Sequence, residues 1–356
     1  MPIDPPRWWY PGTARPGPWS RIAPWLLSPA SGLIAIGSRL RTWRATPYEA
    51  GLPVICIGNF TAGGTGKTPL AIEIAKRLKA KGFRPFILTR GYGGTITGPY
   101  DVNPDRDVAA RVGDEPLLLA RVAPVVVARD RAMGARHIER MGADVIIMDD
   151  GMQNPSLAKT LTIAVVDGTR GLGNGWTMPS GPARAPLADQ VPLADAVVVN
   201  GNGSCTQDSI PNGFAGAVLY GKLSPAPAAA SLADKNVVAF SGIGNPSRFH
   251  ETLAGCGATL VAQHSFADHH TFTDIDARKI IASAATGDTT IVTTEKDLVR
   301  LPHTPEANPR TELRKRSYAL PVEFRFQDSD SGRLDALLEM ALGQRKVQAG
   351  QPGPSP

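Results

Sequence analysis

The chain has 356 residues, of which 42% are hydrophobic and 20% are charged, and its formal net charge is +6. This composition is typical of a globular protein and excludes an intrinsically disordered chain. The three cysteines, Cys56, Cys205 and Cys256, lie far apart and lack the spacing of metal ligands. We therefore predict a reducing compartment, no disulfide framework, and a simple core role for Cys56. The positive charge fits a nucleic acid, a membrane surface or a phosphorylated substrate, and it does not choose among them.

The N-terminal region predicts a helix that associates with a membrane. An uncharged stretch at 22–38 is bracketed by Arg21 and Arg39, and several tryptophans precede it. A helix that crosses a bilayer needs about 20 apolar residues, whereas this stretch is shorter and contains Pro24 and Pro29. Tryptophans beside an apolar segment with arginines at its ends are typical of a helix that lies in a membrane interface. The alternative is a helix that packs on a soluble domain.

The most specific motif follows an apolar run that begins at Val54. This run predicts a buried parallel strand, and Thr61-Ala-Gly-Gly-Thr-Gly-Lys-Thr68 comes directly after it. Beyond the motif, Leu70, Ile74 and Leu78 are spaced four apart, which predicts an amphipathic helix. Backbone N–H groups and the helix dipole favour an anion at such a junction of strand, loop and helix.

The motif predicts a nucleotide phosphate loop. In such a loop Lys67 would reach the β- and γ-phosphates of ATP, and the hydroxyl of Thr68 would face Mg²⁺. The pattern departs from the standard one at its first position, where Thr61 replaces glycine. The alternative, an ordinary strand–turn–helix with an exposed lysine, is less favoured because both flanking elements are predicted. The predicted ATP-binding residues are Thr61, Ala62, Gly63, Gly64, Thr65, Gly66, Lys67 and Thr68.

Two pairs of acidic residues lie near predicted strands and helices. Asp149 and Asp150 follow a strand predicted at 143–148, and carboxylates in that place suit the Mg²⁺ side of a phosphate site. Asp114 and Glu115 stand before an apolar helix, where acids commonly complement the helix dipole. The residue pattern alone therefore favours a metal site for the first pair and a structural role for the second.

The remaining pattern alternates strands and helices. Asp268-His-His270 follows one of these strands, and adjacent histidines are poorly spaced for a single metal ion. We favour a histidine that is oriented by a neighbouring acid and handles a proton. A helix is predicted at 275–285, and further strands are predicted at 84–89, 125–128, 161–166, 194–199, 237–241, 259–266, 289–294 and 322–326.

This alternation indicates an α/β protein. We predict two Rossmann-like, P-loop NTPase-type α/β domains together with the N-terminal membrane-associated helix. The predicted divisions are the N-terminal segment at 1–46, the nucleotide-binding domain at 47–200, a linker at 201–213, a second α/β domain at 214–330, a C-terminal helix at 331–347 and a disordered tail at 348–356.

Six motifs, in this order, resemble those of the tetraacyldisaccharide 4′-kinase family, the lipid A 4′-kinases. The likeness extends from the N-terminal apolar segment to about Phe326. Met152, Asn154 and Ala185 depart from the family's usual Phe, His and Glu. Methionine keeps an apolar side chain, whereas the loss of the histidine and the glutamate affects two secondary contacts and not the core chemistry. The motifs are the Thr61–Thr68 loop with Pro69, Arg90-Gly-Tyr-Gly93, Gly113-Asp-Glu-Pro116, Asp149-Asp-Gly-Met-Gln153, Asp268-His-His270 and Thr294-Glu-Lys-Asp297.

The resemblance implies an ATP- and Mg²⁺-dependent kinase that phosphorylates the 4′-hydroxyl of a tetraacyl-disaccharide 1-phosphate. It also implies a site in the cleft between two α/β domains, at the cytoplasmic face of the bacterial inner membrane. Asp114 and His269 would then form the catalytic pair, which reverses the structural role favoured above for Asp114. The implied metal ligands are Thr68, Asp149, Asp150 and Glu115. The implied substrate contacts are Tyr92, Arg131, Arg184 and Gln153, with Arg129 as an alternative to Arg131. Lys67 would act in catalysis.

Three other functions remain as alternatives. A dimeric regulatory ATPase with a Gly-Lys-Gly-Gly-x-Gly-Lys-Thr loop would carry its extra lysine at position 62, where this chain has Ala62. A membrane-associated nucleotide-binding module without enzymatic activity would leave Asp114 and His269 without a role. A nucleic-acid-binding protein is least favoured, because lysine and arginine are dispersed and no recognition motif is present.

Overall fold

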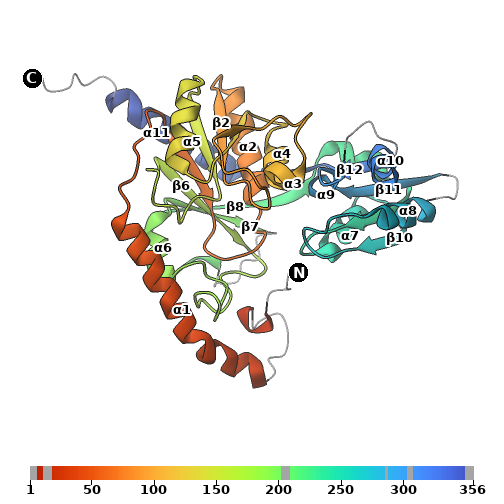
Figure 1. The fold of residues 1–356 in the computed structure, drawn as a ribbon, viewed down its shortest axis with the longest axis horizontal. Helices are drawn as coiled ribbons and strands as arrows, with labels where there is room; N and C mark the ends of the chain where they lie inside the picture. The colour runs from red at the N-terminus through yellow and green to blue at the C-terminus, as the bar shows by residue number, and fades with distance from the viewer. Residues whose placement is uncertain (1–5, 11–17, 202–208, 285–287, 303–307, 349–356) are drawn as a thin grey trace, which may run out of the picture.

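The computed structural model describes residues 6–10, 18–201, 209–284, 288–302 and 308–348. These residues form an α/β structure, as the sequence predicts, and their strands lie in two separate sheets (Figure 1). The larger sheet has the strand order β13 (Val322–Phe326), β8 (Ala217–Pro225), β7 (Ala196–Asn200), β6 (Leu161–Asp167), β1 (Val54–Gly58), β5 (Val145–Asp149), β2 (Pro85–Thr89), β4 (Val125–Val127) and β3 (Tyr100–Asp101). The smaller sheet has the order β10 (Thr259–Ser265), β9 (Asn236–Ser241), β11 (Thr289–Thr294) and β12 (Ser317–Leu320).

Helices cover both sheets. Short 3₁₀ helices lie at Arg7–Trp9, Val191–Leu193 and Pro227–Leu232. The α-helices are α1 (Pro18–Arg44), α2 (Lys67–Ala80), α3 (Ala109–Val112), α4 (Asp114–Leu119), α5 (Arg131–Arg140), α6 (Leu187–Gln190), α7 (Pro246–Gly255), α8 (Asp274–Ser283), α9 (Glu295–Leu298), α10 (Pro309–Arg316) and α11 (Asp328–Gln348).

The centre of the larger sheet is buried on both faces. β1 pairs in parallel with β5 and β6, and alternate residues of β1 enter different core clusters. Ile55 and Ile57 pack with residues of α2 and α11, whereas Val54 and Cys56 pack with residues of α5. Parallel strands that are covered on both sides are near-continuous apolar runs, which explains why the sequence predicts these strands. Burial raises the pKa of the Cys56 thiol to about 12, as suits a core residue.

The smaller sheet is an insertion between two strands of the larger one. β8 and β13, which pair antiparallel to each other, belong to the larger sheet and flank the whole of β9–β12 in sequence. The second domain predicted at 214–330 therefore contains strands of both sheets. β8 was not predicted, because Gly221 and Lys222 interrupt its apolar run. Most of the predicted linker, Cys205 and nearly all of the predicted tail lie outside the described residues.

Helix α1 runs along the outside of the larger sheet, past α6 (Figure 1). It continues through Pro24 and Pro29 and is longer than the predicted stretch at 22–38. The Ser31 hydroxyl donates a hydrogen bond to the carbonyl of Thr177 at 2.9 Å, which fixes the inner side of the helix. Within the described part of the chain, neither α1 nor any other helix combines the length and apolar character needed to cross a membrane.

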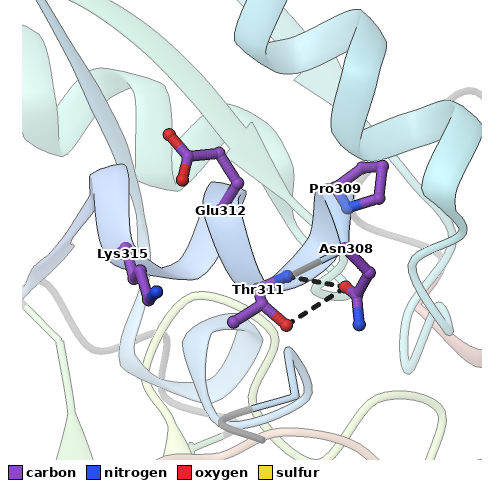
Figure 2. A pocket seen from close by; sticks show the side chains of 5 residues that line it. All are labelled: Asn308, Pro309, Thr311, Glu312 and Lys315. Atoms are coloured by element: carbon purple, nitrogen blue, oxygen red, sulfur yellow. Dashed lines mark hydrogen bonds between the residues drawn. The ribbon is translucent and has the colours of Figure 1, made fainter. Parts of the chain in front are cut away.

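A hollow beside α10 has a structural explanation. Figure 2 shows Asn308 at the start of this helix, where its side-chain oxygen accepts hydrogen bonds from the Thr311 amide at 2.9 Å and the Thr311 hydroxyl at 3.1 Å. Pro309, Glu312 and Lys315 complete the lining. These contacts cap a helix, and none of the residues predicted for the active site is among them.

The packing of α2 on the larger sheet gives a first prediction. Ile74 is fully buried, so replacing it with alanine should lower the free energy of unfolding by about 2–5 kcal/mol, because a cavity remains. Ile72 lies on the same helix but is only partly buried, so Ile72→Ala should cost clearly less. Denaturant unfolding of both variants measures this difference. Equal losses would contradict the placement of α2.

Candidate active site

The phosphate loop joins β1 to α2 at the carboxyl end of the parallel strands. Gly66 caps α2 with φ +98° and ψ 21°, and as a glycine it offers no side chain to the first turn of the helix. A Cβ at Gly66 would lie 2.6 Å from Nδ2 of Asn200, which donates a hydrogen bond to the carbonyl of Thr65 at 3.0 Å. Glycine is therefore needed here for its φ and for the close approach of β7. The N–H groups that begin α2 remain available to an anion.

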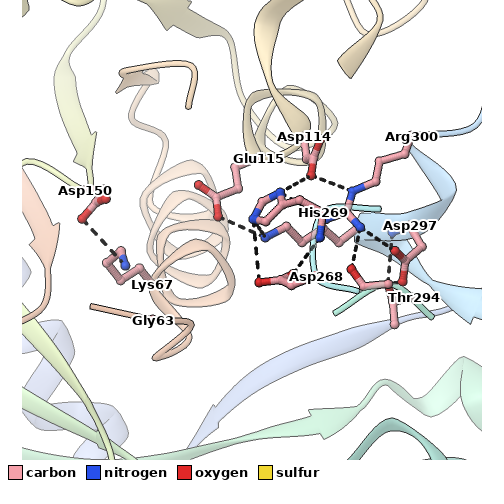
Figure 3. Close-up of polar contacts among 12 residues, drawn as sticks. Gly63, Lys67, Asp114, Glu115, Asp150, Asp268, His269, Thr294, Asp297 and Arg300 are labelled. Carbon is pink, nitrogen blue, oxygen red and sulfur yellow. Dashed lines mark hydrogen bonds and ion pairs between the residues drawn. The ribbon is translucent and has the colours of Figure 1, made fainter. Parts of the chain in front are cut away.

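Two cations of the site contact the same carboxylate. Nζ of Lys67 lies 3.7 Å from Oδ1 of Asp150, a contact that Figure 3 shows. Nη1 of Arg184 lies 3.2 Å from the same oxygen, and Nη2 donates to Oδ2 at 3.2 Å. Asp150 has a φ of +53°, which is uncommon for a residue other than glycine and typical of functional sites. Because two positive charges share one negative charge, a phosphate group would find favourable charge here.

Asp149 is buried without a hydrogen-bond partner. It ends β5 opposite Ile57 of β1 and is 1% exposed. Among the described residues, neither of its carboxylate oxygens has a partner. Burial, followed by the negative charges of Glu115 and Asp150, raises the pKa of Asp149 to about 8. The described residues include no group of three or more His, Cys, Asp or Glu that could hold a metal ion by itself.

The predicted catalytic pair is brought together from the two sheets. Asp114 begins α4, beside the larger sheet, and His269 follows β10 of the smaller sheet. Nδ1 of His269 lies 3.0 Å from Oδ2 of Asp114, although the two residues are 155 positions apart in sequence (Figure 3). His269 has a φ of +57°. The proximity that the resemblance implied is therefore present.

Lys296 defines the tautomer of His269. Its Nζ lies 3.3 Å from Nε2 of His269 and 3.6 Å from Oε1 of Glu115. An ammonium group can only donate hydrogen bonds, so Nε2 of the imidazole must be the acceptor. In the neutral ring Nδ1 then carries the proton and donates it to Asp114.

The charges around Asp114 keep it ionised. Burial alone would raise the pKa of Asp114, but the hydrogen bond from His269 and the positive charges of Arg300 and Lys296 outweigh this effect. The net result is a pKa below the usual value for aspartate. At neutral pH Asp114 is therefore a carboxylate, as a proton acceptor must be.

The residues predicted to contact substrate are placed in different ways. Tyr92 is 73% exposed, and its ring centroid lies 6.0 Å from that of His269. Gln153 donates hydrogen bonds to the carbonyl of Asn59 and to Oε1 of Gln190, both at 2.7 Å. Arg131 is only 2% exposed and donates to the carbonyl of Ala128. Burial lowers the pKa of Arg131 to about 10. Tyr92 and Arg184 are thus open to a ligand, whereas Gln153 and Arg131 mainly brace the protein.

Two departures from the family pattern are internal. Met152 is 1% exposed and Ala185 is 4% exposed, so both fill the core. Oδ1 of Asn154 accepts hydrogen bonds from the amide and hydroxyl of Ser156. The burial and contacts of these three residues therefore indicate structural roles.

Sequence reasoning missed Arg300, a central residue of the site. Arg300 donates from Nε to Oδ2 of Asp114 at 2.7 Å, and its side chain is 5% exposed. Asp297, the last residue of the Thr294–Asp297 motif, accepts a hydrogen bond from Nη1 of Arg300 at 2.7 Å. The sequence offers one indication of this pair: an aspartate and an arginine three residues apart, Asp297 and Arg300, can form an ion pair on one face of a helix.

Comparisons with known proteins agree on one family. The sequence profile of the family described as Tetraacyldisaccharide-1-P 4′-kinase (LpxK) matches residues 23–342. The tetraacyldisaccharide 4′-kinase of Rhodospirillum centenum is 45% identical over 345 residues, which cover 95% of this chain and 96% of that protein. The tetraacyldisaccharide 4′-kinase of Paramagnetospirillum magneticum is 48% identical over 277 residues, covering 78% and 85% of the two chains.

A solved structure gives the same result. The crystal structure of LpxK from Aquifex aeolicus in complex with ATP has 25% sequence identity and a TM-score of 0.71. The match covers 90% of this chain and 99% of that one. The profile and the relatives each span most of the chain, and the α/β fold agrees with them. The chain belongs to the tetraacyldisaccharide-1-phosphate 4′-kinase family.

Proposed function

We propose that this protein transfers the γ-phosphate of ATP to the 4′-hydroxyl of tetraacyldisaccharide 1-phosphate, a step of lipid A biosynthesis. The observation that carries this proposal is the Asp114–His269 pair, because a simple nucleotide-binding module needs no such pair. The pair accompanies an uncapped phosphate loop with Lys67, in a chain that belongs to the 4′-kinase family. The solved relative with bound ATP supports the same nucleotide for this chain.

The phosphate loop would bind and neutralise ATP. Phosphoryl transfer depends on positioning and charge stabilisation more than on covalent chemistry. The N–H groups of the loop and of the start of α2 would hold the phosphates, and Lys67 and Arg184 would turn from Asp150 to the transferring group. Each cation would then exchange one anionic partner, Asp150, for another, the transferring phosphate.

Asp114 would accept the proton of the acceptor hydroxyl. The 4′-O–H bond breaks, its proton passes to the carboxylate, and the 4′-oxygen forms a bond to the γ-phosphorus. The bond between that phosphorus and the bridging oxygen breaks, and ADP leaves with the electron pair. His269 would donate its Nδ1–H bond to Asp114 throughout, which holds the carboxylate in place.

The residues near Asp149 fit a magnesium ion. Asp149 combines full burial with two carboxylate oxygens that have no partner among the described residues. Mg²⁺ is commonly held by one or two carboxylates together with substrate phosphates, which agrees with the absence of a larger protein cluster among the described residues. We propose Thr68, Asp149, Asp150 and Glu115 as its ligands, directly or through water. When bound, Mg²⁺ would neutralise charge on the transferring phosphate.

We further propose that the two sheets with their helices act as two domains and that the substrate enters between them. Asp149 ends β5 of the larger sheet and Lys67 begins α2, which packs on that sheet, whereas His269 follows β10 of the smaller sheet and Lys296 lies in α9 after β11. Tyr92, exposed and close to His269, would contact the sugar or its phosphate. Closure on substrate would exclude water from the groups that act on the acceptor hydroxyl.

Helix α1 would bind the cytoplasmic face of the bacterial inner membrane. Ile22 and Leu40 each lie about two and a half helical turns from Ser31, so they point away from the side that Ser31 anchors. Ile22, Leu33 and Leu40 are 51%, 71% and 44% exposed. An apolar stripe opposite an anchored side, with Arg41 and Arg44 in the last turn, suits an interface rich in anionic lipid. The protein would then bind its acylated substrate at the membrane surface that α1 contacts.

Catalysis can be tested in detergent micelles with labelled ATP and tetraacyldisaccharide 1-phosphate. Lys67→Ala and Asp114→Ala should each lower kcat by at least about 100-fold, because each removes charge or proton transfer that acts on the transition state. Phosphorylated lipid is quantified by chromatography. A wild-type protein that binds ATP and yields no product with this acceptor would overturn the proposed function.

The magnesium site predicts a pH-dependent stability. Because the pKa of Asp149 is raised, the folded protein keeps a proton that the unfolded chain loses, so stability declines from about pH 4 toward pH 8. In metal-free buffer, Asp149→Asn should be no more stable than wild type near pH 4. Near pH 8 it should be more stable by at least about 1 kcal/mol. Mg²⁺ with ATP should then stabilise wild type more than the variant.

A control of opposite sign is available for this measurement. Arg84 holds the pKa of Asp144 below its usual value through hydrogen bonds, so Asp144→Asn should lose stability near pH 8 and lose none at a pH below that pKa. Denaturant unfolding from a pH below the pKa of Asp144 up to pH 8 gives the free energy of unfolding of both variants. An Asp149→Asn effect that does not change with pH would argue against the protonated carboxyl.

The membrane role of α1 predicts a loss of vesicle binding. The triple variant Ile22→Ser, Leu33→Ser, Leu40→Ser should bind anionic phospholipid vesicles at least about 10-fold more weakly, because each exposed apolar side chain contributes on burial. Ile275→Ser is the control, since Ile275 is 77% exposed on α8. Vesicle co-sedimentation measures both. Unchanged binding of the triple variant would remove α1 from the proposal.

A further inference from the structure

We infer that Arg300 is a positioning residue that holds Asp114 across the two sheets and leaves one oxygen, Oδ1, for the acceptor hydroxyl. This inference rests on the proposed function, since it assigns the geometry of the proposed base. The guanidinium of Arg300 is nearly buried, with 5% of the side chain exposed. Nε donates to Oδ2 of Asp114 at 2.7 Å, although 186 positions separate the two residues (Figure 3).

Arg300 is itself held rigidly by the smaller sheet. Nη1 donates to Oδ1 of Asp297 at 2.7 Å, and Asp297 is fully buried. The other oxygen of Asp297 accepts from the Thr294 hydroxyl at 2.6 Å, and the Asp297 amide donates back to that hydroxyl at 3.0 Å. Thr294 ends β11, so the chain of contacts runs from a strand to the base. A side chain fixed by charged, buried partners can orient another group precisely enough for chemistry.

Arg300 and the backbone of His269 share one hydrogen-bond acceptor. Nη1 of Arg300 also donates to the carbonyl of Gly242 at 2.7 Å, and this carbonyl accepts from the amide of His269 at 3.1 Å. A Cβ at Gly242 would lie 3.2 Å from Oδ1 of Asp297, so the turn packs closely against the cluster. One carbonyl therefore fixes Arg300 relative to the backbone of His269.

Both donors to Asp114 meet at a single oxygen. His269 Nδ1 and Arg300 Nε both bond to Oδ2, at 3.0 Å and 2.7 Å. Within the described part of the chain, no hydrogen bond is found at Oδ1, and Asp114 keeps 14% of its side chain exposed. The carboxylate is thus fixed at one end and open at the other. An acceptor hydroxyl can reach Oδ1 without displacing either donor.

The test compares Arg300→Gln and Arg300→Lys with wild type in the micelle assay. Arg300→Gln should lower kcat by about 10- to 100-fold, because a charged hydrogen bond to the base is lost. The KM values for ATP and lipid should stay within about 2-fold, since binding groups are untouched. Arg300→Lys should recover part of the loss, because lysine retains the charge without the planar fork.

A double substitution separates positioning from general damage. If Arg300 acts through Asp114, then Arg300→Gln combined with Asp114→Asn should be no slower than Asp114→Asn alone, because the two act as a unit. Arg310→Gln is the matched control: Arg310 Nε donates to Oδ1 of Asp274 at 2.7 Å on the smaller sheet's helices. It should leave kcat unchanged.

The possible folding defect has its own control. Arg300→Gln leaves Asp297 buried without its cation, so Asp297→Asn is added to form a neutral pair, and thermal unfolding and ATP binding are measured for both. A folded, ATP-binding variant with wild-type kcat would overturn the inference. So would a loss that multiplies with that of Asp114→Asn, or one confined to the KM for ATP. An inactive wild type would instead refute the proposed function.

Discussion

Asp114 must remain a carboxylate while most of its side chain is buried, and it does so because donors from the smaller sheet face it. His269 and Arg300 come from segments 155 and 186 positions away in sequence. Neither could reach Asp114 unless the chain left the larger sheet after β8 and rejoined it at β13. The antiparallel pairing of these two strands therefore allows a carboxylate beside one sheet to be contacted by donors from the other.

Two carboxylates of the candidate site are paired with cations in the structure. Asp150 holds Lys67 and Arg184, and Asp114 holds Arg300. Asp149 is the exception, since burial and neighbouring acids raise its pKa. In our proposal its counterpart is a cation that arrives with the nucleotide. Positive φ angles at Asp150 and His269 indicate that the backbone accepts strain to keep these side chains in place.

Much of the fold was predictable because buried parallel strands are continuous apolar runs. The predicted strands are present, with ends shifted by about two residues or fewer. β8 was missed because its residues are half-buried and include Gly221 and Lys222. In the candidate site, the local residue pattern predicted the phosphate loop and a metal-binding role for Asp149. A catalytic role for Asp114 was predicted only through the resemblance. Arg300 was not predicted, because its partner Asp114 lies 186 positions away in sequence and only the fold brings the two together.

One loop connects the proposed membrane surface to the proposed nucleotide site. Trp176 packs against Trp25 of α1, with ring centroids 4.9 Å apart. Six residues further on, the carbonyl of Pro182 accepts a hydrogen bond from the amide of Ala62 in the phosphate loop at 2.8 Å. The same loop then supplies Arg184 to Asp150. A helix that docks on lipid through its outer stripe would thus be fixed, through this loop, to the groups that hold the phosphates. In this proposal, the loop would keep the ATP site of a kinase with a lipid acceptor at a set distance from the bilayer.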